Sequence, residues 1–168
     1  TLGLDYQSAI TMNYKNQITT AASGFGIGPI DPANPGTQSG TFASNDLEQP
    51  AEVKVGVAYE FAGNWMVTAD YKNIAWGDAK GYKEFNWKNQ NVFGIGGKYS
   101  ADKFWAGVGY NFGENPIEKA DATSFPNVAT NLFNNHFFPA VTTSHITFGG
   151  GYSFTESLSL EGAVTFAP

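Results

Sequence analysis

Apolar and polar residues alternate one by one near the end of the chain. Over residues 145–166, two such runs are joined by the polar turn Thr155-Glu156-Ser157. Successive side chains of a β-strand point to opposite faces, whereas a helix repeats about every 3.6 residues. The pattern therefore predicts a β-hairpin with one apolar face and one face of small and polar residues. No segment shows the helical period, so we expect strands and loops alone.

The same alternating unit recurs along the chain. Its runs are about 9 to 13 residues long, close to the roughly 9 to 11 that a tilted strand needs to cross a membrane. They predict seven strands, at 2–15, 52–61, 65–72, 92–99, 104–112, 145–154 and 158–166.

The connections between these strands alternate in length. Long loops are expected at about 17–49, 77–89 and 113–144, and short turns at 62–64, 100–103 and 155–157. Transmembrane β-barrels have short periplasmic turns, longer extracellular loops and girdles of aromatic residues at the membrane surfaces. Aromatic residues of the apolar parity do gather beside the short turns: Tyr59, Phe61, Trp65, Tyr99, Phe104, Tyr152 and Phe154. The sequence therefore predicts an all-β fold, an antiparallel transmembrane β-barrel over residues 1–168.

A soluble barrel or sandwich is the alternative, because alternation alone does not say which face points inward. The polar parity is rich in Gly, Ala, Ser and Thr with isolated charges, which suits a crowded lumen better than a solvated exterior. We therefore expect the apolar parity to face outward. Two sets of residues test this: Val55, Phe148 and Leu160 should avoid a packed interior, and Lys54, Thr147 and Glu161 should avoid bulk water.

Composition excludes several other classes of protein. Only 14% of the 168 residues are charged, against about 25% in soluble domains, and 15% are aromatic. The net charge is -6 and the nine basic residues are scattered, so no nucleic-acid partner is expected. Cysteine is absent, which excludes a disulfide framework or a thiolate metal site. No apolar run approaches the roughly 18 residues of a membrane-spanning helix, so any crossing must be by strands.

The predicted strands are odd in number, and the first begins almost at Thr1 with no signal peptide before it. Bacterial barrels close with an even number of strands, and an open sheet edge in lipid is costly. We expect the chain to be part of a larger barrel whose remaining strands belong to the same or another chain.

Several short motifs carry a resemblance to a known family. They are Leu2-Gly3-Leu4-Asp5-Tyr6-Gln7-Ser8, the Trp87 stretch leading into Phe93-Gly94-Ile95-Gly96-Gly97-Lys98-Tyr99, Gly107-Val108-Gly109-Tyr110-Asn111-Phe112 followed by Asn115-Pro116-Ile117, and Phe138-Pro139-Ala140 followed by His145-Ile146-Thr147-Phe148-Gly149-Gly150-Gly151-Tyr152. In this order they resemble the FadL-type outer-membrane transport family, which takes up long-chain fatty acids and aromatic hydrocarbons. The resemblance implies a fourteen-stranded barrel with an N-terminal plug, of which this chain is the later part. Because the plug and early strands have no counterpart here, the family's binding residues are not carried over.

The function expected from pattern and resemblance is passive uptake of hydrophobic small molecules across the bacterial outer membrane, such as long-chain fatty acids or aromatic hydrocarbons. The expected partners are membrane lipid, lipopolysaccharide and a hydrophobic solute, with no cofactor and no metal. A general porin or a surface-loop-displaying outer-membrane protein is the alternative. An enzyme is not expected, because Ser144 and His145 are adjacent in a strand and face opposite ways.

An apolar cluster within the loop at 113–144 supplies most of the candidate binding residues. Leu132, Phe133, Phe137 and Phe138, with Phe125, Phe85 and Trp87, are candidates for a landing surface outside the membrane. Burying apolar ligand area there is worth about 25 cal/mol per Å². The alternative is that these rings pack against neighbouring loops and close the mouth of the barrel. Trp105 on the lumen parity is a further candidate, with simple filling of the lumen as the favoured alternative.

Charged residues on the inward parity are expected to pair with one another, because isolated charges in a narrow lumen are costly. They are Asp5, Lys54, Glu60, Asp70, Lys72, Lys98 and Glu161. Selection of permeant ions is their alternative role.

Overall fold

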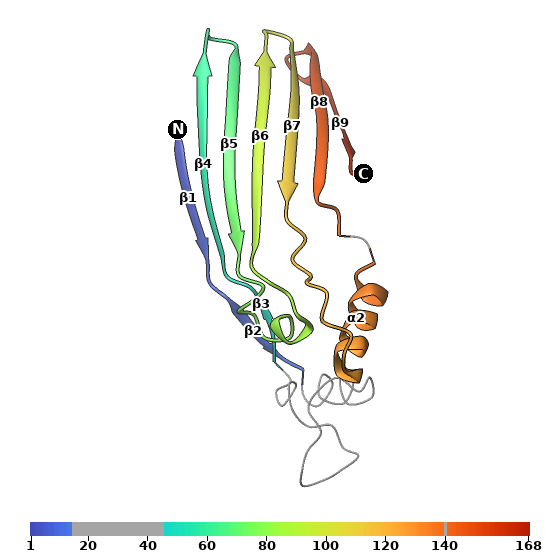
Figure 1. Cartoon of the computed structure of the whole chain (residues 1–168). Coiled ribbons are helices and arrows are strands. Elements are labelled where there is room, and N and C mark those ends of the chain that lie inside the picture. The colour runs from blue at the N-terminus through green and yellow to red at the C-terminus, as the bar shows by residue number, and fades with distance from the viewer. Residues whose placement is uncertain (15–45, 140) are drawn as a thin grey trace.

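A computed structural model describes residues 1–14, 46–139 and 141–168. Its main feature is a seven-stranded antiparallel sheet in the order β1-β4-β5-β6-β7-β8-β9 (Figure 1). The strands are β1 (Leu2–Gln7), β4 (Glu52–Phe61), β5 (Trp65–Ile74), β6 (Gln90–Ser100), β7 (Phe104–Gly113), β8 (Ser144–Thr155) and β9 (Leu158–Phe166). The prediction of an all-β, antiparallel architecture with seven strands side by side is confirmed.

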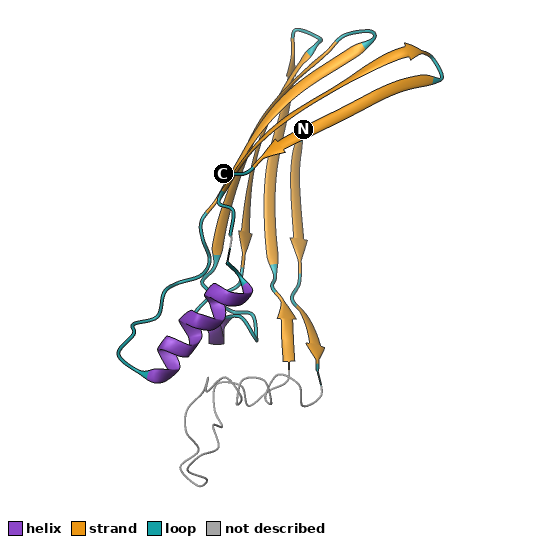
Figure 2. Ribbon diagram, turned by 90° about the vertical axis from the view of Figure 1, so that its right-hand side faces the viewer, coloured by secondary structure: helices purple, strands orange, loops and turns teal. Residues whose placement is uncertain are grey.

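The sheet is long, twisted and curved, like a section of a barrel wall (Figure 2). The short connections after β4, β6 and β8 lie at one end of it, which we call the turn end (Figure 1). The longer connections lie at the opposite end, the loop end. Ala62 and Gly63 in the first short turn have positive φ angles of 51° and 70°, a backbone geometry that matches the right-handed twist of the paired strands.

The first predicted strand, 2–15, is wrong as a single element. β1 ends at Gln7, and β2 (Ile10–Asn13) leaves the main sheet to pair with β3 (Asp46–Gln49) in a separate two-stranded sheet. The break lies opposite Pro50, which separates β3 from β4 and has no backbone N–H to donate to a ladder. Both strands of the long hairpin are therefore interrupted at the same level. Most of the predicted loop at 17–49 lies outside the described residues.

The expectation of strands and loops alone is also wrong. The predicted loop at 113–144 contains helix α2 (Phe125–Phe137), and the one at 77–89 contains the short 3-10 helix η1 (Lys83–Phe85). The side of α2 that packs inward includes two buried polar residues, Thr130 and Asn134. The helical period is nevertheless present in this segment, so the interpretation that no segment shows it is wrong: apolar residues recur at helical spacing at Phe125, Val128, Ala129, Leu132, Phe133 and Phe137.

The two faces of the sheet differ in exposure. The side chains of Val55, Phe148 and Leu160 are 39%, 58% and 68% exposed. Lys54 and Thr147, on the other parity, are partly covered and line cavities of the concave face, while Glu161 on the edge strand β9 stays exposed. Curvature crowds concave side chains together and spreads convex ones apart. The apolar parity is therefore convex and the polar parity concave.

Little of the apolar surface is hidden in a core. Within the described residues, the buried hydrophobic side chains are Ile74, Ala79 and Ala129, all in or beside the long connections. The sheet itself has no packed interior on either face.

Candidate functional site

Aromatic rings form a nearly continuous belt around the convex face at the turn end. The ring of Trp65 lies 4.9 Å from that of Tyr99 and 6.4 Å from that of Phe61. Tyr99 is 5.8 Å from Phe104, and on β8 the rings of Tyr152 and Phe154 are 5.0 Å apart. Rings of this kind favour the headgroup level of a bilayer, where one end is apolar and the other wet.

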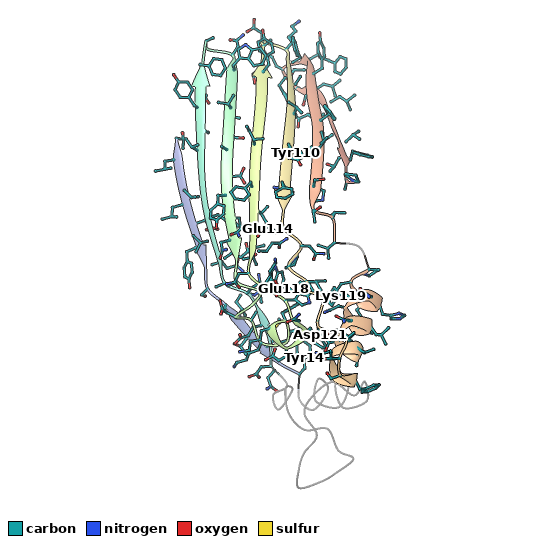
Figure 3. The ribbon with its side chains drawn as sticks, viewed as in Figure 1. Tyr14, Tyr110, Glu114, Glu118, Lys119 and Asp121 are labelled. Carbon is teal, nitrogen blue, oxygen red and sulfur yellow. The ribbon has the colours of Figure 1, made fainter. Side chains whose placement is uncertain are left out.

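A second group of convex aromatic side chains lies toward the loop end. Tyr71 packs 5.2 Å from Phe93, and its hydroxyl donates to Oδ1 of Asn91 at 2.7 Å. Tyr110 on β7 also lies toward the loop end of the sheet (Figure 3). It follows Phe104 by six residues, which is roughly 20 Å along a strand and comparable to the apolar band of about 25 Å in membrane barrels.

The concave face carries a chain of ion pairs across β1, β4 and β5. Nζ of Lys54 lies 3.7 Å from Oδ2 of Asp5 and 3.3 Å from Oε2 of Glu52, and Nζ of Lys72 lies 3.8 Å from the same Glu52 oxygen. The expected pairing is thus confirmed for Asp5 with Lys54, whereas Lys72 pairs with Glu52, a residue outside the expected set. Glu52, the centre of the chain, was missed, although its strand parity placed it on this face.

Lys98 and Glu161 do not follow the expected pairing, because both contact Trp105. The indole Nε1 of Trp105 donates to Oε1 of Glu161 at 3.2 Å, and Nζ of Lys98 lies 4.8 Å from the centroid of the indole. The indole lies against two glycines of β8: a Cβ at Gly149 would be 3.3 Å from it, and one at Gly151 would overlap it. Glycines of the neighbouring strand therefore make the room in which Trp105 lies.

Rings from two connections meet at the loop end. This outer aromatic cluster consists of Trp76, Tyr82, Phe85, Trp87, Phe133, Phe137 and Phe138. Trp87 is its centre, with ring centroids 5.2 Å from Trp76, 5.2 Å from Tyr82 and 5.0 Å from Phe138. Phe133 of α2 stacks on Phe85 at 4.1 Å and lies 4.6 Å from Phe137. Burial raises the pKa of the Tyr82 phenol above its ordinary value.

Two asparagine side chains anchor α2 beside this cluster. Asn134 is 2% exposed; its Oδ1 accepts from Nε1 of Trp87 at 3.2 Å, and its Nδ2 donates to the carbonyl of Phe85 at 2.7 Å. Asn131 makes a pair of bonds with the backbone N–H and C=O of Ala120, at 2.9 and 2.8 Å. The segment that leads into α2 passes beside the helix with Glu118 and Lys119 (Figure 3). Hydrogen bonds thus hold the helix that carries two of the seven rings of the cluster, Phe133 and Phe137.

Four of the six candidate binding residues are brought together in the outer aromatic cluster: Trp87, Phe133, Phe137 and Phe138. Leu132 lies on the same helix with its side chain 64% exposed, as does Phe125 at 68%. Trp105, at the turn end of β7, is separate from them. Sequence reasoning missed Trp76 and Tyr82, whose aromatic character was the available signal, and Asn134, for which the sequence offers none.

His145 and the acidic side chains are of the kinds that serve in catalysis or metal binding. Nε2 of His145 lies 3.0 Å from the hydroxyl of Thr142. Over the described ranges, no three His, Cys, Asp or Glu side chains come together as a metal site. Nor does that part of the chain contain a helix long and apolar enough to cross a membrane.

No family model and no curated protein matches this sequence. Solved structures do match it. The toluene transporter TodX of Pseudomonas putida aligns over 80% of this chain and 34% of its own, with a TM-score of 0.51 and 21% identity. A second TodX structure gives a TM-score of 0.51 and 22% identity, covering 77% and 33%, and a deletion mutant of this monoaromatic hydrocarbon channel gives 0.51 and 22%, covering 77% and 34%.

The chain spans about a third of the length of these structures, 34% in the first of them. Its strands reproduce part of their fold, and TodX is a FadL-type channel. At 21% identity the likeness concerns the fold alone. The resemblance that the short motifs indicated is thus confirmed for the fold: the chain is built like part of a FadL-type barrel.

Proposed function

We propose that this chain is part of the wall of a bacterial outer-membrane channel that passes hydrophobic small molecules inward without an energy source of its own. The observation that carries the proposal is the orientation of the sheet. Its convex face is apolar, exposed and bordered by aromatic residues at both ends, while its concave face carries small and polar residues. Lipid against the convex face accounts for its apolar residues, and an aqueous lumen against the concave face accounts for its small and polar residues.

The directions of the edge strands constrain how such a barrel closes. Six antiparallel pairings separate β1 from β9, so the two edge strands run in the same direction. A barrel that is antiparallel throughout then needs an odd number of further strands. Two copies of this sheet would join β9 to β1 of the other copy in parallel. The remaining strands therefore come from other segments, of the same or another polypeptide.

The outer aromatic cluster is the proposed landing surface for the solute. It lies at the loop end, which is the extracellular end in barrels of this kind. Phe125, Leu132 and Phe137 of α2 expose more than half of their side chains. Aromatic hydrocarbons and long-chain fatty acids are the solute classes that we propose, since both gain by burying apolar surface against such rings.

The test is solute uptake by liposomes that contain the full-length protein. We expect uptake of radiolabelled toluene or a long-chain fatty acid, well above protein-free liposomes, with little ionic current in planar bilayers. Large open-channel currents without preference for hydrophobic solutes would instead identify a general porin and overturn the proposal.

A further inference from the structure

Lys98 differs from the other lysines of the concave face. Lys54 and Lys72 each lie within 4.0 Å of a carboxylate oxygen, whereas Lys98 has no such partner in the part of the chain that the structure describes. Its ammonium group lies over the indole of Trp105, a neutral ring that does not cancel the charge. The positive charge of Lys98 is therefore available to an anion.

The residues around Lys98 do not supply that anion. Across the sheet, its neighbours on the two adjacent strands are Met66 on β5 and Gly107 on β7. Glu60 is one strand further away, opposite Met66, and Glu161 accepts the indole hydrogen bond of Trp105. Asp70 lies on the far side of Thr68, against the backbone of Gly94.

A cavity of about 280 Å³ opens beside this ammonium group. Its walls include Met66, Thr68, Trp105 and Thr147. Its floor is glycine backbone where Gly96 pairs with Gly109, and the Trp105 indole covers the next pair, Gly107 and Gly149, as a side wall. Pockets for drug-sized ligands have volumes of about 300 to 1,000 Å³, so this cavity suits a ligand with a single ring.

We propose that this cavity binds a small aromatic carboxylate. The flat ring lies on the glycine floor between Met66 and Trp105, and the carboxylate accepts hydrogen bonds from the Lys98 ammonium and from the hydroxyl of Thr68, which lies on the strand next to Lys98. The proposal rests on the proposed function, since it requires the concave face to line a solute path. It adds a class of solute that carries a charge as well as a ring.

The test is calorimetric titration of the full-length protein, in detergent micelles, with benzoate, toluene and octanoate. For Lys98→Met we expect at least about a tenfold loss of benzoate affinity, because a charged hydrogen bond is removed, and a change of less than about twofold for toluene. Lys88→Met is the matched control: Lys88 pairs with Glu118 at 3.5 Å in the loop region, so its loss should leave benzoate binding unchanged.

A second variant tests the floor of the cavity. A Cβ at Gly109 would have its nearest neighbour, the carbonyl oxygen of Ile95, at 3.8 Å, so Gly109→Ala should fold and raise the floor of the cavity. We expect it to weaken benzoate and toluene binding alike. Unchanged benzoate affinity in Lys98→Met, or octanoate binding as tightly as benzoate, would overturn the proposal. If the benzoate results contradict the proposal but the protein still takes up toluene, the carboxylate site is wrong and the proposed function stands. If the unmodified protein takes up no hydrophobic solute at all, the proposed function itself is wrong.

Discussion

Asn134 joins three parts of the loop end through one side-chain amide. It lies on α2, accepts from the indole of Trp87 and donates to the carbonyl of Phe85, the last residue of η1. The amide is almost fully buried, so its own donor and acceptor depend on these two bonds. A single polar residue thus fixes the geometry of rings on two separate connections.

Replacing Asn134 with Ala should loosen α2 without unfolding the sheet. A part-buried donor, the indole of Trp87, and a part-buried acceptor, the carbonyl of Phe85, would each lose a partner, at no more than about 1–3 kcal/mol for each group. We expect faster hydrogen exchange over 125–137 and a red shift of tryptophan fluorescence. Asn135→Ala, at the exposed neighbouring position, is the control and should leave both readouts unchanged. Equal effects of the two variants would show that the Asn134 amide does not anchor the helix.

Gly151 is required by the position of the Trp105 indole. A Cβ there would overlap the indole nitrogen, whereas a Cβ at Gly162 on the next strand would meet nothing within 4 Å. We expect Gly151→Ala to destabilise the folded protein by about 1–3 kcal/mol through overpacking, and Gly162→Ala to have little effect. Urea unfolding of the protein in lipid vesicles measures both. A similar stability for the two variants would place Trp105 elsewhere.

At the scale of elements, the strands could be predicted because their side chains alternate in polarity. The positions Val53, Val55 and Val57 belong to β4 and are exposed as the period of two requires. Helix α2 does not follow the period of two, but its apolar residues Val128, Leu132 and Phe133 recur at helical spacing, so a test for the period of 3.6 could have found it. Pro50 was a sequence signal for the interruption between β1 and β2. The alternation of polarity continues through Ser8 and Ala9, and it led to the prediction of a single strand.

The small β2–β3 sheet depends on the charge of Glu48. Its carboxylate accepts from the backbone N–H of Lys80 at 2.9 Å and from the hydroxyl of Thr11 at 2.9 Å, and it lies 3.5 Å from the Lys80 ammonium. The bond from the Lys80 backbone is the main reason why the pKa of Glu48 lies below its ordinary value of 4.5. The charged form is therefore favoured by folding.

Acid should open this small sheet before it affects the main one. Because the pKa of Glu48 is lowered in the folded state, its stabilising contribution is complete above the ordinary value of 4.5 and is lost as the pH falls through the lowered value. We expect the protection factors of the amides over 10–13 and 46–49, measured against the intrinsic exchange rate at each pH, to fall below pH 4.5. In Glu48→Gln these protection factors should already be low at neutral pH and should no longer change with pH. Protection factors that are independent of pH in the unmodified protein would contradict this role.

At the scale of the whole molecule, the candidate site divides into a predictable and an unpredictable part. Aromatic residues in long connections marked the outer cluster, because large rings seldom stay solvated in a loop. Which rings meet depends on the path of two connections, and that path is set by polar contacts such as those of Asn131 and Asn134. The period of two carries no information about those contacts.

The orientation of the whole sheet can be tested by placing one charge on either face. Val108 is convex and lies on β7 between the two aromatic groups, half exposed. Thr147 is concave, at a similar level on β8, opposite Gly109. If lipid covers the convex face, Val108→Lys should cost about 2–4 kcal/mol, the depth-dependent price of a cation near the bilayer midplane, while Thr147→Lys should cost much less. Equilibrium unfolding of the full-length protein from lipid vesicles gives both values. If the concave variant were the more damaging of the two, lipid would have to contact the polar parity, and a channel with this face as its lumen would be excluded.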